Sequence, residues 1–308
     1  MSTNTKIKKQ NNWTYFKKNY EFYLLLLPGL LFIALFKFLP MGGLVIAFKD
    51  FNIFDGILAS PWVGLEHFKA VFSDEYFFQV FRNTLLISTY KIAFTFPLPI
   101  IVAILLNEVK NMTFKKNIQT VIYLPHFLSW VIVQGLFVTI LGSTGIVNQI
   151  LEPFISEPIR FYMDKSLFRS ILVGTSAWKE VGWGTIVYLA AITGIDPQLY
   201  EAAVVDGANK WKQIIHITIP SITSTIVLMF ILRLGYVLEA GFSQVIVMYN
   251  STVYEVADII GTYVYRTGLG QMNFSYGTAV GIFNSVVAFV LVISGNLMCK
   301  KALGKSIW

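Results

Sequence analysis

The feature that most constrains this chain is a series of six long apolar segments. They cover residues 22–39, 84–106, 123–141, 170–192, 220–236 and 279–299. About 20 mostly apolar residues in an α-helix cross the roughly 30 Å hydrocarbon layer of a bilayer. Hydrophobic residues make up 55% of the chain and charged residues 13%, whereas a soluble domain is about one quarter charged. The sequence therefore predicts an all-α, polytopic bundle of six transmembrane helices.

The apolar segments also define the domain organisation. A basic tail at 1–21 precedes a single transmembrane unit at 22–299, and a short terminus follows at 300–308. No small-x-small cleavage site follows the first segment, and Lys37 and Pro40 close it instead. We therefore interpret it as a retained helix rather than a signal peptide.

The lysines indicate how the bundle is oriented. With six spans, one side of the membrane receives the two ends of the chain and the loops after the second and fourth segments, and this side is rich in lysine and poor in acids. Its lysines are Lys6, Lys8, Lys9, Lys17, Lys18, Lys110, Lys115, Lys116, Lys210, Lys212, Lys300, Lys301 and Lys305. Because basic loops stay inside, both termini are expected to be cytoplasmic. The formal charge of +7 then fits a membrane protein, and no nucleic-acid partner is expected.

The loop at 193–219 carries the most distinctive motif. Residues 200–205 are good helix formers, Gly207 permits the positive φ that ends a helix, and Asn209 can cap the next one. Two short helices are expected to meet at a tight corner. The motif residues are Glu201, Ala202, Ala203, Asp206, Gly207 and Ala208, followed by Ile217 and Pro220.

This loop resembles the EAA loop of the inner-membrane permease subunits of binding-protein-dependent ABC importers, which have the MetI-like transmembrane fold. Other similar stretches are Pro28-Gly29, Gly64-Leu65 and Asn83-Thr84. The chain looks most like the MalF-type carbohydrate branch and, within it, the lipoprotein-associated LplB-like members that take up oligosaccharides or polysaccharide fragments.

The resemblance implies a bacterial plasma-membrane subunit that forms half of a transport pathway. Its partners would be a second EAA-bearing permease in a heterodimer, two ATP-binding subunits, an extracytoplasmic solute-binding protein or lipoprotein, and membrane lipid. The loop would fit a groove on the ATPase, with Glu201 and Asp206 at the contact, Ala202 and Ala203 allowing close approach and Gly207 making the turn. The chain itself would bind no cofactor, and ATP and Mg would sit on the ATPase subunits.

The outer loop at 42–83 is rich in aromatic residues spaced like short interfacial helices. An aromatic belt with Asn83 as an N-cap explains most of this pattern. About forty residues leave no room for a separately folded outer domain.

Enzymatic motifs are missing from the sequence. It has no Gly-x-x-x-x-Gly-Lys-Ser/Thr phosphate loop, so the energy source must be another polypeptide. It has no His-Glu-x-x-His or Gly-x-Ser-x-Gly, and His67, His126 and His216 are scattered, which argues against a metal site. The lone Cys299 permits no internal disulfide. We expect a non-catalytic permease subunit.

Residues that face the transport pathway are expected among the ionisable and aromatic side chains of the spans, because buried charges in a membrane tend to face a bundle interior and sugars offer hydroxyls and apolar ring faces. The candidates are Lys91, Trp178, Lys179, Glu180, Trp183, Tyr188, Arg233, Tyr236, Glu239 and Asn284. The alternatives are that Lys91 snorkels, that Lys179 pairs with Glu180, and that Arg233 pairs with Glu239 or with a partner subunit. The aromatic candidates are equally compatible with packing or lipid contact.

Pro97 and Pro99 interrupt the second span and predict a bent helix there, because proline removes backbone donors. Three other functions stay open at this point: an importer permease for another solute, a secondary transporter, and a membrane-embedded enzyme such as a glycosyltransferase. The second and third spans lack the acids that ion coupling needs, and the outer carboxylates form no catalytic cluster. The sequence does not select one sugar.

Overall fold

The computed structural model describes residues 12–307, and regular structure in that range is helical apart from one isolated antiparallel bridge between Lys49 and Trp62. The longer helices are α2 (Tyr20–Ile33), α6 (Glu75–Thr95), α7 (Pro97–Glu108), α8 (Met112–Tyr123), α9 (Trp130–Leu141), α11 (Lys165–Thr193), α14 (Ile219–Gly235) and α18 (Phe274–Leu303). The shorter ones are α1 (Asn12–Lys18), α3 (Leu39–Met41), α4 (Gly56–Ala59), α5 (Glu66–Ser73), α10 (Ile146–Leu151), α12 (Pro197–Val205), α13 (Lys210–Gln213), α15 (Phe242–Met248), α16 (Tyr254–Ala257) and α17 (Ile260–Val264).

Five helical stretches are long and apolar enough to cross a membrane: Tyr20–Phe48, Glu75–Glu108, Trp130–Phe154, Lys210–Gly235 and Phe274–Leu303. The predicted fourth span lies within α11, whose 29 residues correspond to about 43 Å of helix. Arg169, Lys179 and Glu180 lower its apolarity, and it is not among the five. The all-α membrane fold is therefore confirmed, whereas the count of six spans stays a prediction.

The third predicted span, 123–141, was wrong as a continuous helix. Helix α8 ends at Tyr123, a 3-10 turn covers Leu124–Phe127, and α9 begins only at Trp130. Pro125 has no amide hydrogen, and Ser129 adopts an extended backbone so that its hydroxyl accepts the amide of Ile132. The break is thus built into the local sequence.

The second predicted span is also divided. Helix α6 ends at Thr95 and α7 starts at Pro97, with Phe96 between them. Pro97 and Pro99 have no backbone donors, so the hydrogen-bond ladder cannot run through this point. Phe96 itself keeps helical dihedrals and its amide donates to Ile92 O at 3.2 Å, so the prolines interrupt the helical hydrogen bonds after it, and the predicted bend stays a prediction.

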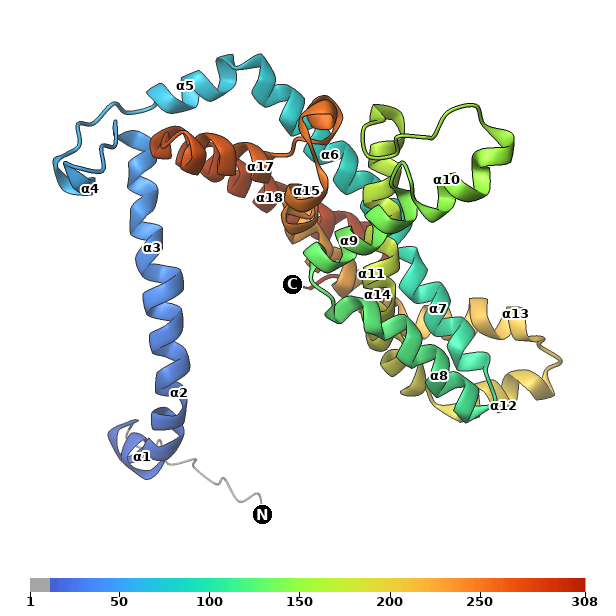
Figure 1. Cartoon of the computed structure of the whole chain (residues 1–308). Coiled ribbons are helices and arrows are strands. Elements are labelled where there is room, and N and C mark those ends of the chain that lie inside the picture. Colours follow the sequence, from blue (N-terminus) through green and yellow to red (C-terminus); the bar gives the residue numbers. More distant parts are fainter. Residues whose placement is uncertain (1–11, 308) are drawn as a thin grey trace.

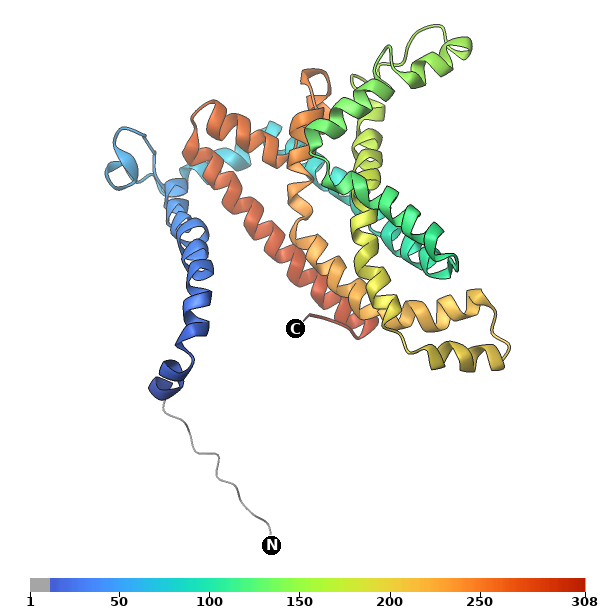
Figure 2. The same cartoon turned by 60° about the horizontal axis from the view of Figure 1, so that its bottom comes forward.

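The elements separate toward two ends of the molecule. Helices α4, α5 and α10 lie at one end, whereas α1, the α12–α13 hairpin and the start of α14 lie at the other (Figures 1 and 2). The described C-terminal end lies near the second group in Figure 2. Of the predicted basic tail, residues 1–11 lie outside the described range, and the remainder forms α1 and the start of α2.

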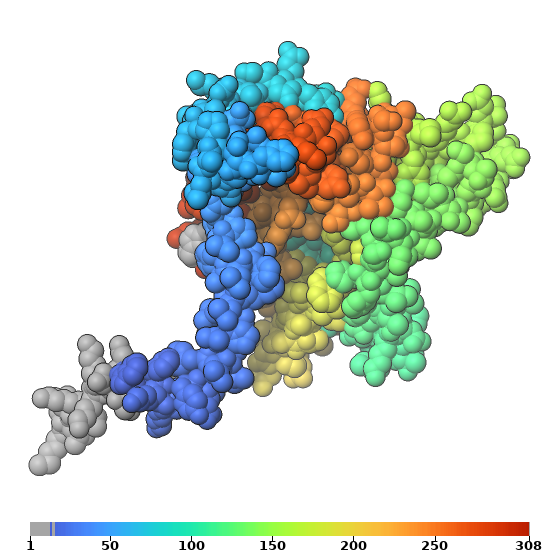
Figure 3. Space-filling view, turned by 60° about the vertical axis from the view of Figure 1, so that its left-hand side comes forward, coloured from blue at the N-terminus to red at the C-terminus, as the bar shows by residue number. Residues whose placement is uncertain are grey.

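The N-terminal arm stands clear of the bundle. It runs through α2 and α3 along the side of the molecule, and the space-filling view shows it as a separate column (Figure 3). None of the most apolar 18-residue window of Tyr20–Phe48 is buried within this chain. A membrane or another subunit must cover this surface.

Helix α11 is the central element of the bundle and packs on α6, α7, α8 and α14. Gly182 on α11 makes one of these contacts possible, because a Cβ there would collide with the backbone of Ile122 and Tyr123 on α8. Near the α12–α13 end, Ala103, Tyr188 and Ile222 belong to one buried cluster contributed by α7, α11 and α14. Helices α7, α11 and α14 therefore share a core.

A buried carboxylate organises the opposite end. The side chain of Asp258 is fully buried and accepts hydrogen bonds from Tyr76 Oη (2.7 Å) and Thr262 Oγ1 (2.7 Å), and Arg266 Nη2 lies 2.6 Å away. Burial alone would lower the pKa of Arg266, but the hydrogen bond and negative charge of Asp258 raise it above its usual value. This cluster joins the start of α6 to the segment that follows α15.

Asn83 is not the N-cap that the sequence suggested. It lies inside α6, and the cap of that helix is Asp74, which accepts the amide of Tyr76 at 2.9 Å. Asn83 Nδ2 instead donates to the carbonyls of Glu255 and Asp258, and its Oδ1 accepts from Arg169 on α11. The amide therefore joins α6, α11 and the loop containing α16.

Candidate functional site

The α12–α13 hairpin has the corner that the sequence predicted. Asp196 caps α12 by accepting the amide of Gln198, Gly207 has φ +76°, and Asn209 caps α13 by accepting the amide of Lys212. A Cβ at Gly207 would meet nothing within 4 Å. The left-handed φ, rather than crowding, is what favours glycine at this position.

Three side-chain contacts hold the hairpin, one within its corner and two to the elements around it. Tyr200 Oη lies 2.9 Å from Thr218 Oγ1, and Gln213 Nε2 donates to Ala208 O at 3.0 Å. Lys210 Nζ lies 3.0 Å from Glu108 Oε2 at the end of α7. Because this last pair is largely exposed, it orients the hairpin more than it stabilises it.

The hairpin presents a mixed apolar and acidic surface. Of the predicted motif residues, Glu201, Ala202, Asp206 and Gly207 are exposed and Ala203 and Ala208 are half-buried. Val205 and Trp211 are 87% and 73% exposed. Large exposed apolar side chains beside charges are typical of a protein docking surface.

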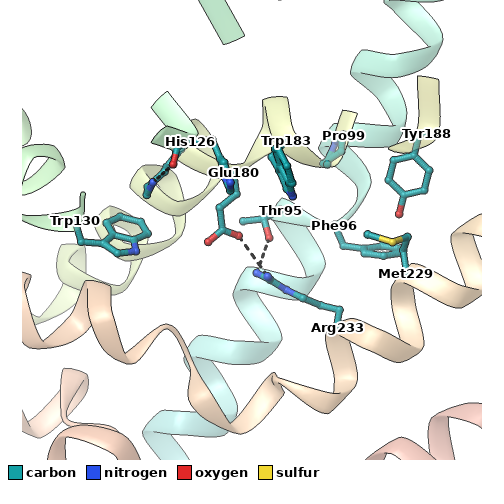
Figure 4. A pocket seen from close by; sticks show the side chains of 12 residues that line it. Thr95, Phe96, Pro99, His126, Trp130, Glu180, Trp183, Tyr188, Met229 and Arg233 are labelled. Carbon is teal, nitrogen blue, oxygen red and sulfur yellow. Dashed lines mark hydrogen bonds and ion pairs between the residues drawn. The ribbon is translucent and has the colours of Figure 1, made fainter. Parts of the chain in front are cut away.

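Within the bundle, a cavity of about 390 Å³ opens between α6, α7, the α8–α9 break, α11 and α14 (Figure 4). The rings of His126 and Trp183 stack with centroids 4.5 Å apart and planes within 6°. The other lining residues are Thr95, Phe96, Pro99, Trp130, Lys179, Glu180, Gly184, Tyr188, Met229 and Arg233.

A second cavity of about 230 Å³ adjoins the first. It is lined by Ser88, Lys91, Ile92, Ser176, Glu180, Arg233, Tyr236, Val237, Glu239, Ala240 and Gly241. Glu180 and Arg233 line both cavities. Arg233 Nη1 lies 3.3 Å from Glu180 Oε2, and Arg233 Nη2 donates to Thr95 Oγ1 at 3.5 Å, so three helices meet at this pair (Figure 4).

The ammonium groups of both lysines predicted to face the pathway are hydrogen-bonded to other groups of the protein. Lys179 Nζ donates to the carbonyls of His126 (2.6 Å), Leu128 (2.6 Å) and Pro125 (3.3 Å), and is thereby tied to the break before α9. The suggested Lys179–Glu180 pair was wrong, because backbone carbonyls hold the ammonium instead.

Lys91 is held in the same way at another irregular segment. Its Nζ donates to Ala240 O at 2.9 Å and to Gln244 Oε1 at 2.5 Å. Ala240 has a left-handed backbone with φ 47°. Regular helical hydrogen bonding stops at such a position, and Lys91 supplies a donor for the Ala240 carbonyl. The ammonium is buried rather than snorkelling to an interface.

The structure brings most of the predicted pathway residues to these two cavities. Lys179, Glu180, Trp183, Tyr188 and Arg233 line the larger one, and Lys91, Glu180, Arg233, Tyr236 and Glu239 line the smaller one. Arg233 pairs with Glu180 and not with Glu239, so that suggested pairing was wrong.

Two predicted residues lie elsewhere. Trp178 packs edge-on against Phe137 at 5.4 Å, and Asn284 belongs to neither cavity lining. Sequence reasoning missed Thr95, Phe96, His126, Trp130 and Met229 as lining residues. Pro125, which interrupts the helix beside His126, is the one residue whose type pointed to that region.

The cavity chemistry suits a polar ligand with apolar faces. Stacked and edge-on rings offer flat surfaces, and Glu180, Arg233 and the tyrosine hydroxyls offer hydrogen bonds. Carbohydrates combine these two properties, since ring C–H faces pack on aromatics and hydroxyls take polar contacts.

Comparisons with known proteins agree with this arrangement. Residues 95–301 match the family described as binding-protein-dependent transport system inner membrane component. The polygalacturonan/rhamnogalacturonan transport system permease protein YteP of Bacillus subtilis (strain 168) is 49% identical over 280 residues, which are 91% of this chain and 87% of that protein. Protein LplB of the same organism is 47% identical over 286 residues, 92% of this chain and 90% of its own.

A solved structure is similar over almost the whole chain. It is a bacterial ABC transporter involved in the import of the acidic polysaccharide alginate, with a TM-score of 0.87 and 43% identity over 94% of this chain and 99% of that one. The matched family region includes both the hairpin and the cavity walls from Thr95 to Arg233. The chain belongs to the family of binding-protein-dependent transport system inner membrane components.

Proposed function

We propose that this chain is a transmembrane permease subunit of an ATP-driven importer and forms half of the translocation pathway for a carbohydrate. The substrate is an oligosaccharide or polysaccharide fragment that an extracytoplasmic binding protein delivers. The observation that carries the proposal is the pairing of an exposed hairpin at one end of the bundle with an aromatic and charged cavity between helices packed above it. The choice of substrate class is supported by two proteins similar to this chain, a polygalacturonan/rhamnogalacturonan transport system permease protein and a transporter involved in alginate import.

The hairpin is the proposed contact with an ATPase subunit. Val205 and Trp211 supply apolar surface and Glu201 and Asp206 supply charge. Two ATPase subunits would bind ATP and Mg, and this chain would bind no cofactor. Movement of the hairpin would reach the cavity through the π-helical segment Ile214–Thr218, which joins α13 to α14, the helix that carries Arg233.

The exposed N-terminal arm supports a second permease as a partner. The stretch Tyr20–Phe48 is apolar, and none of its most apolar 18-residue window is buried within this chain, although its end at Gly42–Phe48 packs on α18. A second permease subunit and membrane lipid would together cover it, in a heterodimer whose subunits enclose the pathway. A further structure similar to this chain over 96% of its length is an alginate transporter in complex with a periplasmic protein, which supports a binding-protein partner.

The proposed topology has six spans, including α11, with both termini on the cytoplasmic side of a bacterial plasma membrane. The lysines of the inner loops and ends support this orientation. It places the α12–α13 hairpin on the side where ATP is available.

Uptake into proteoliposomes tests the function. The chain is reconstituted with its second permease, ATPase subunits and binding protein, and entry of a radiolabelled trisaccharide is measured with and without ATP. Accumulation that requires ATP, the binding protein and this chain together is expected. Accumulation driven by an ion gradient in the absence of ATP would contradict the proposal and favour a secondary transporter.

A further inference from the structure

The two cavities of the bundle meet at one charged pair. Glu180 on α11 and Arg233 on α14 line both cavities and lie 3.3 Å apart. Their side chains are 37% and 36% exposed, so they reach into open space and are not sealed in the protein core. The pair therefore belongs to the wall of both cavities.

Arg233 differs from the other basic residues that line the cavities. The ammonium groups of Lys91 and Lys179 are buried, and backbone carbonyls hold both of them. Arg233 has a side-chain carboxylate and the Thr95 hydroxyl as its partners. Its bond to Glu180 can be exchanged for a bond to another carboxylate without leaving a backbone carbonyl unpaired.

A guanidinium suits this exchange. It binds a carboxylate through two parallel N–H donors, and it remains charged at any physiological pH. The stacked rings of His126 and Trp183 lie on the wall of the same cavity, where they can support a sugar ring (Figure 4). Aromatic rings and an exchangeable guanidinium together match a sugar that carries a carboxylate.

We propose that Arg233 is the residue that recognises the carboxylate of an acidic sugar in the transport pathway, and that Glu180 holds Arg233 in place until the sugar carboxylate replaces it. The inference rests on the carbohydrate function proposed above. It narrows the substrate class to oligosaccharides that contain uronic acid residues.

The test compares an acidic probe with a neutral one in the reconstituted complex. The probes are α-1,4-linked trigalacturonate and its fully methyl-esterified form, each with saturating binding protein and ATP. For each probe, the uptake rate of a variant is divided by that of the wild type, so that the preference of the binding protein cancels. The variants are Arg233→Gln and the double variant Glu180→Gln with Arg233→Gln.

The double variant separates recognition from structure. It removes both charges together, so it leaves neither member of the ion pair without a partner. Loss of a charge-assisted hydrogen bond lowers binding by about tenfold or more. We expect the double variant to import trigalacturonate at least about tenfold more slowly, while import of the ester stays within about threefold of wild type. Arg233→Gln alone should be slower still with trigalacturonate, because Glu180 then repels it.

Other outcomes overturn the inference in distinguishable ways. Arg82→Gln, an exposed arginine on α6 outside both linings, serves as the control and should import both probes like wild type. Equal losses for both probes, or recovery of trigalacturonate import to the wild-type rate in the double variant, would show that Arg233 has only a structural role. A wild-type complex that imports the ester alone would refute the acidic substrate, and one that imports neither would also remove the proposed carbohydrate function.

Discussion

Replacement of Lys179 by methionine tests whether this buried lysine has a structural role. Methionine has a similar length but no donor, so three carbonyls lose the ammonium. Pro125 O also accepts the amide of Leu128 at 3.2 Å, which leaves His126 O and Leu128 O as the groups that depend most on Lys179. Each unsatisfied acceptor costs about 1–3 kcal/mol.

Two such acceptors would together cost about 2–6 kcal/mol, and two effects place the expected loss at the lower end of that range. The adjoining cavity can admit water to the carbonyls, and removal of the buried charge recovers part of its desolvation cost. The net loss is about 2–3 kcal/mol, which corresponds to a fall of roughly 4–12 °C in apparent Tm.

The assay is thermal unfolding of the detergent-solubilised chain followed by size-exclusion chromatography. Lys165→Met on the same helix is the control, because Lys165 is exposed and pairs with the equally exposed Glu255. Its Tm should stay near that of the wild type. If the apparent Tm of Lys179→Met equalled that of Lys165→Met, the view that Lys179 stabilises the α8–α9 break would be refuted.

Three further predictions concern other parts of the chain. Asp258→Asn should lower stability by about 3 kcal/mol, because it leaves Arg266 without its buried partner; an unchanged apparent Tm would contradict this. Burial raises the pKa of Asp74, but hydrogen bonds from the Tyr263 hydroxyl and the Tyr76 amide outweigh it and hold that pKa below its usual value. A lowered folded-state pKa stabilises above the unfolded value of about 3.9 and is lost as pH falls through the folded value, so the Tm gap between wild type and Asp74→Asn should be constant from pH 7 to 5 and shrink below about pH 4. A gap that widened on acidification would refute that assignment. Trp183→Ala should slow sugar uptake about 3- to 10-fold by removing one ring of the stacked pair, while copurification of the ATPase stays unchanged; equal uptake would show that the stack does not contact substrate.

Local sequence signals predicted the hairpin correctly. A glycine that must adopt φ +76° and an asparagine that caps the next helix act within a few residues of themselves. The apolar segments were found for the same reason, since length and hydropathy are properties of the segment alone. Their start residues were less certain, and Asp74 rather than Asn83 caps α6.

Features that depend on distant residues were missed. Lys179 contacts carbonyls more than 50 positions away in the sequence, and Arg233 pairs with Glu180 on another helix. Nothing in a single sequence states which helices pack together, so the sequence suggested Glu239 or a partner subunit for Arg233 and did not suggest Glu180. The proline at position 125 is visible in the sequence and favours a helix break. Only the fold shows that Lys179 donates hydrogen bonds to the carbonyls of that break.

The docking role of the α12–α13 hairpin is the central claim, and copurification tests it most directly. The tagged chain is extracted gently from its native membrane, and the accompanying proteins are identified for the wild type, Glu201→Lys, Gly207→Val and the control Lys116→Glu, an exposed lysine on α8 outside the hairpin. An ATPase with a phosphate-binding loop and a second permease are expected with the wild type and the control. Both hairpin variants should lose the ATPase, because one reverses an exposed charge and the other strains the turn. Full recovery of the ATPase with both hairpin variants, or a wild-type chain that is recovered without any ATPase, would refute the docking role of the hairpin.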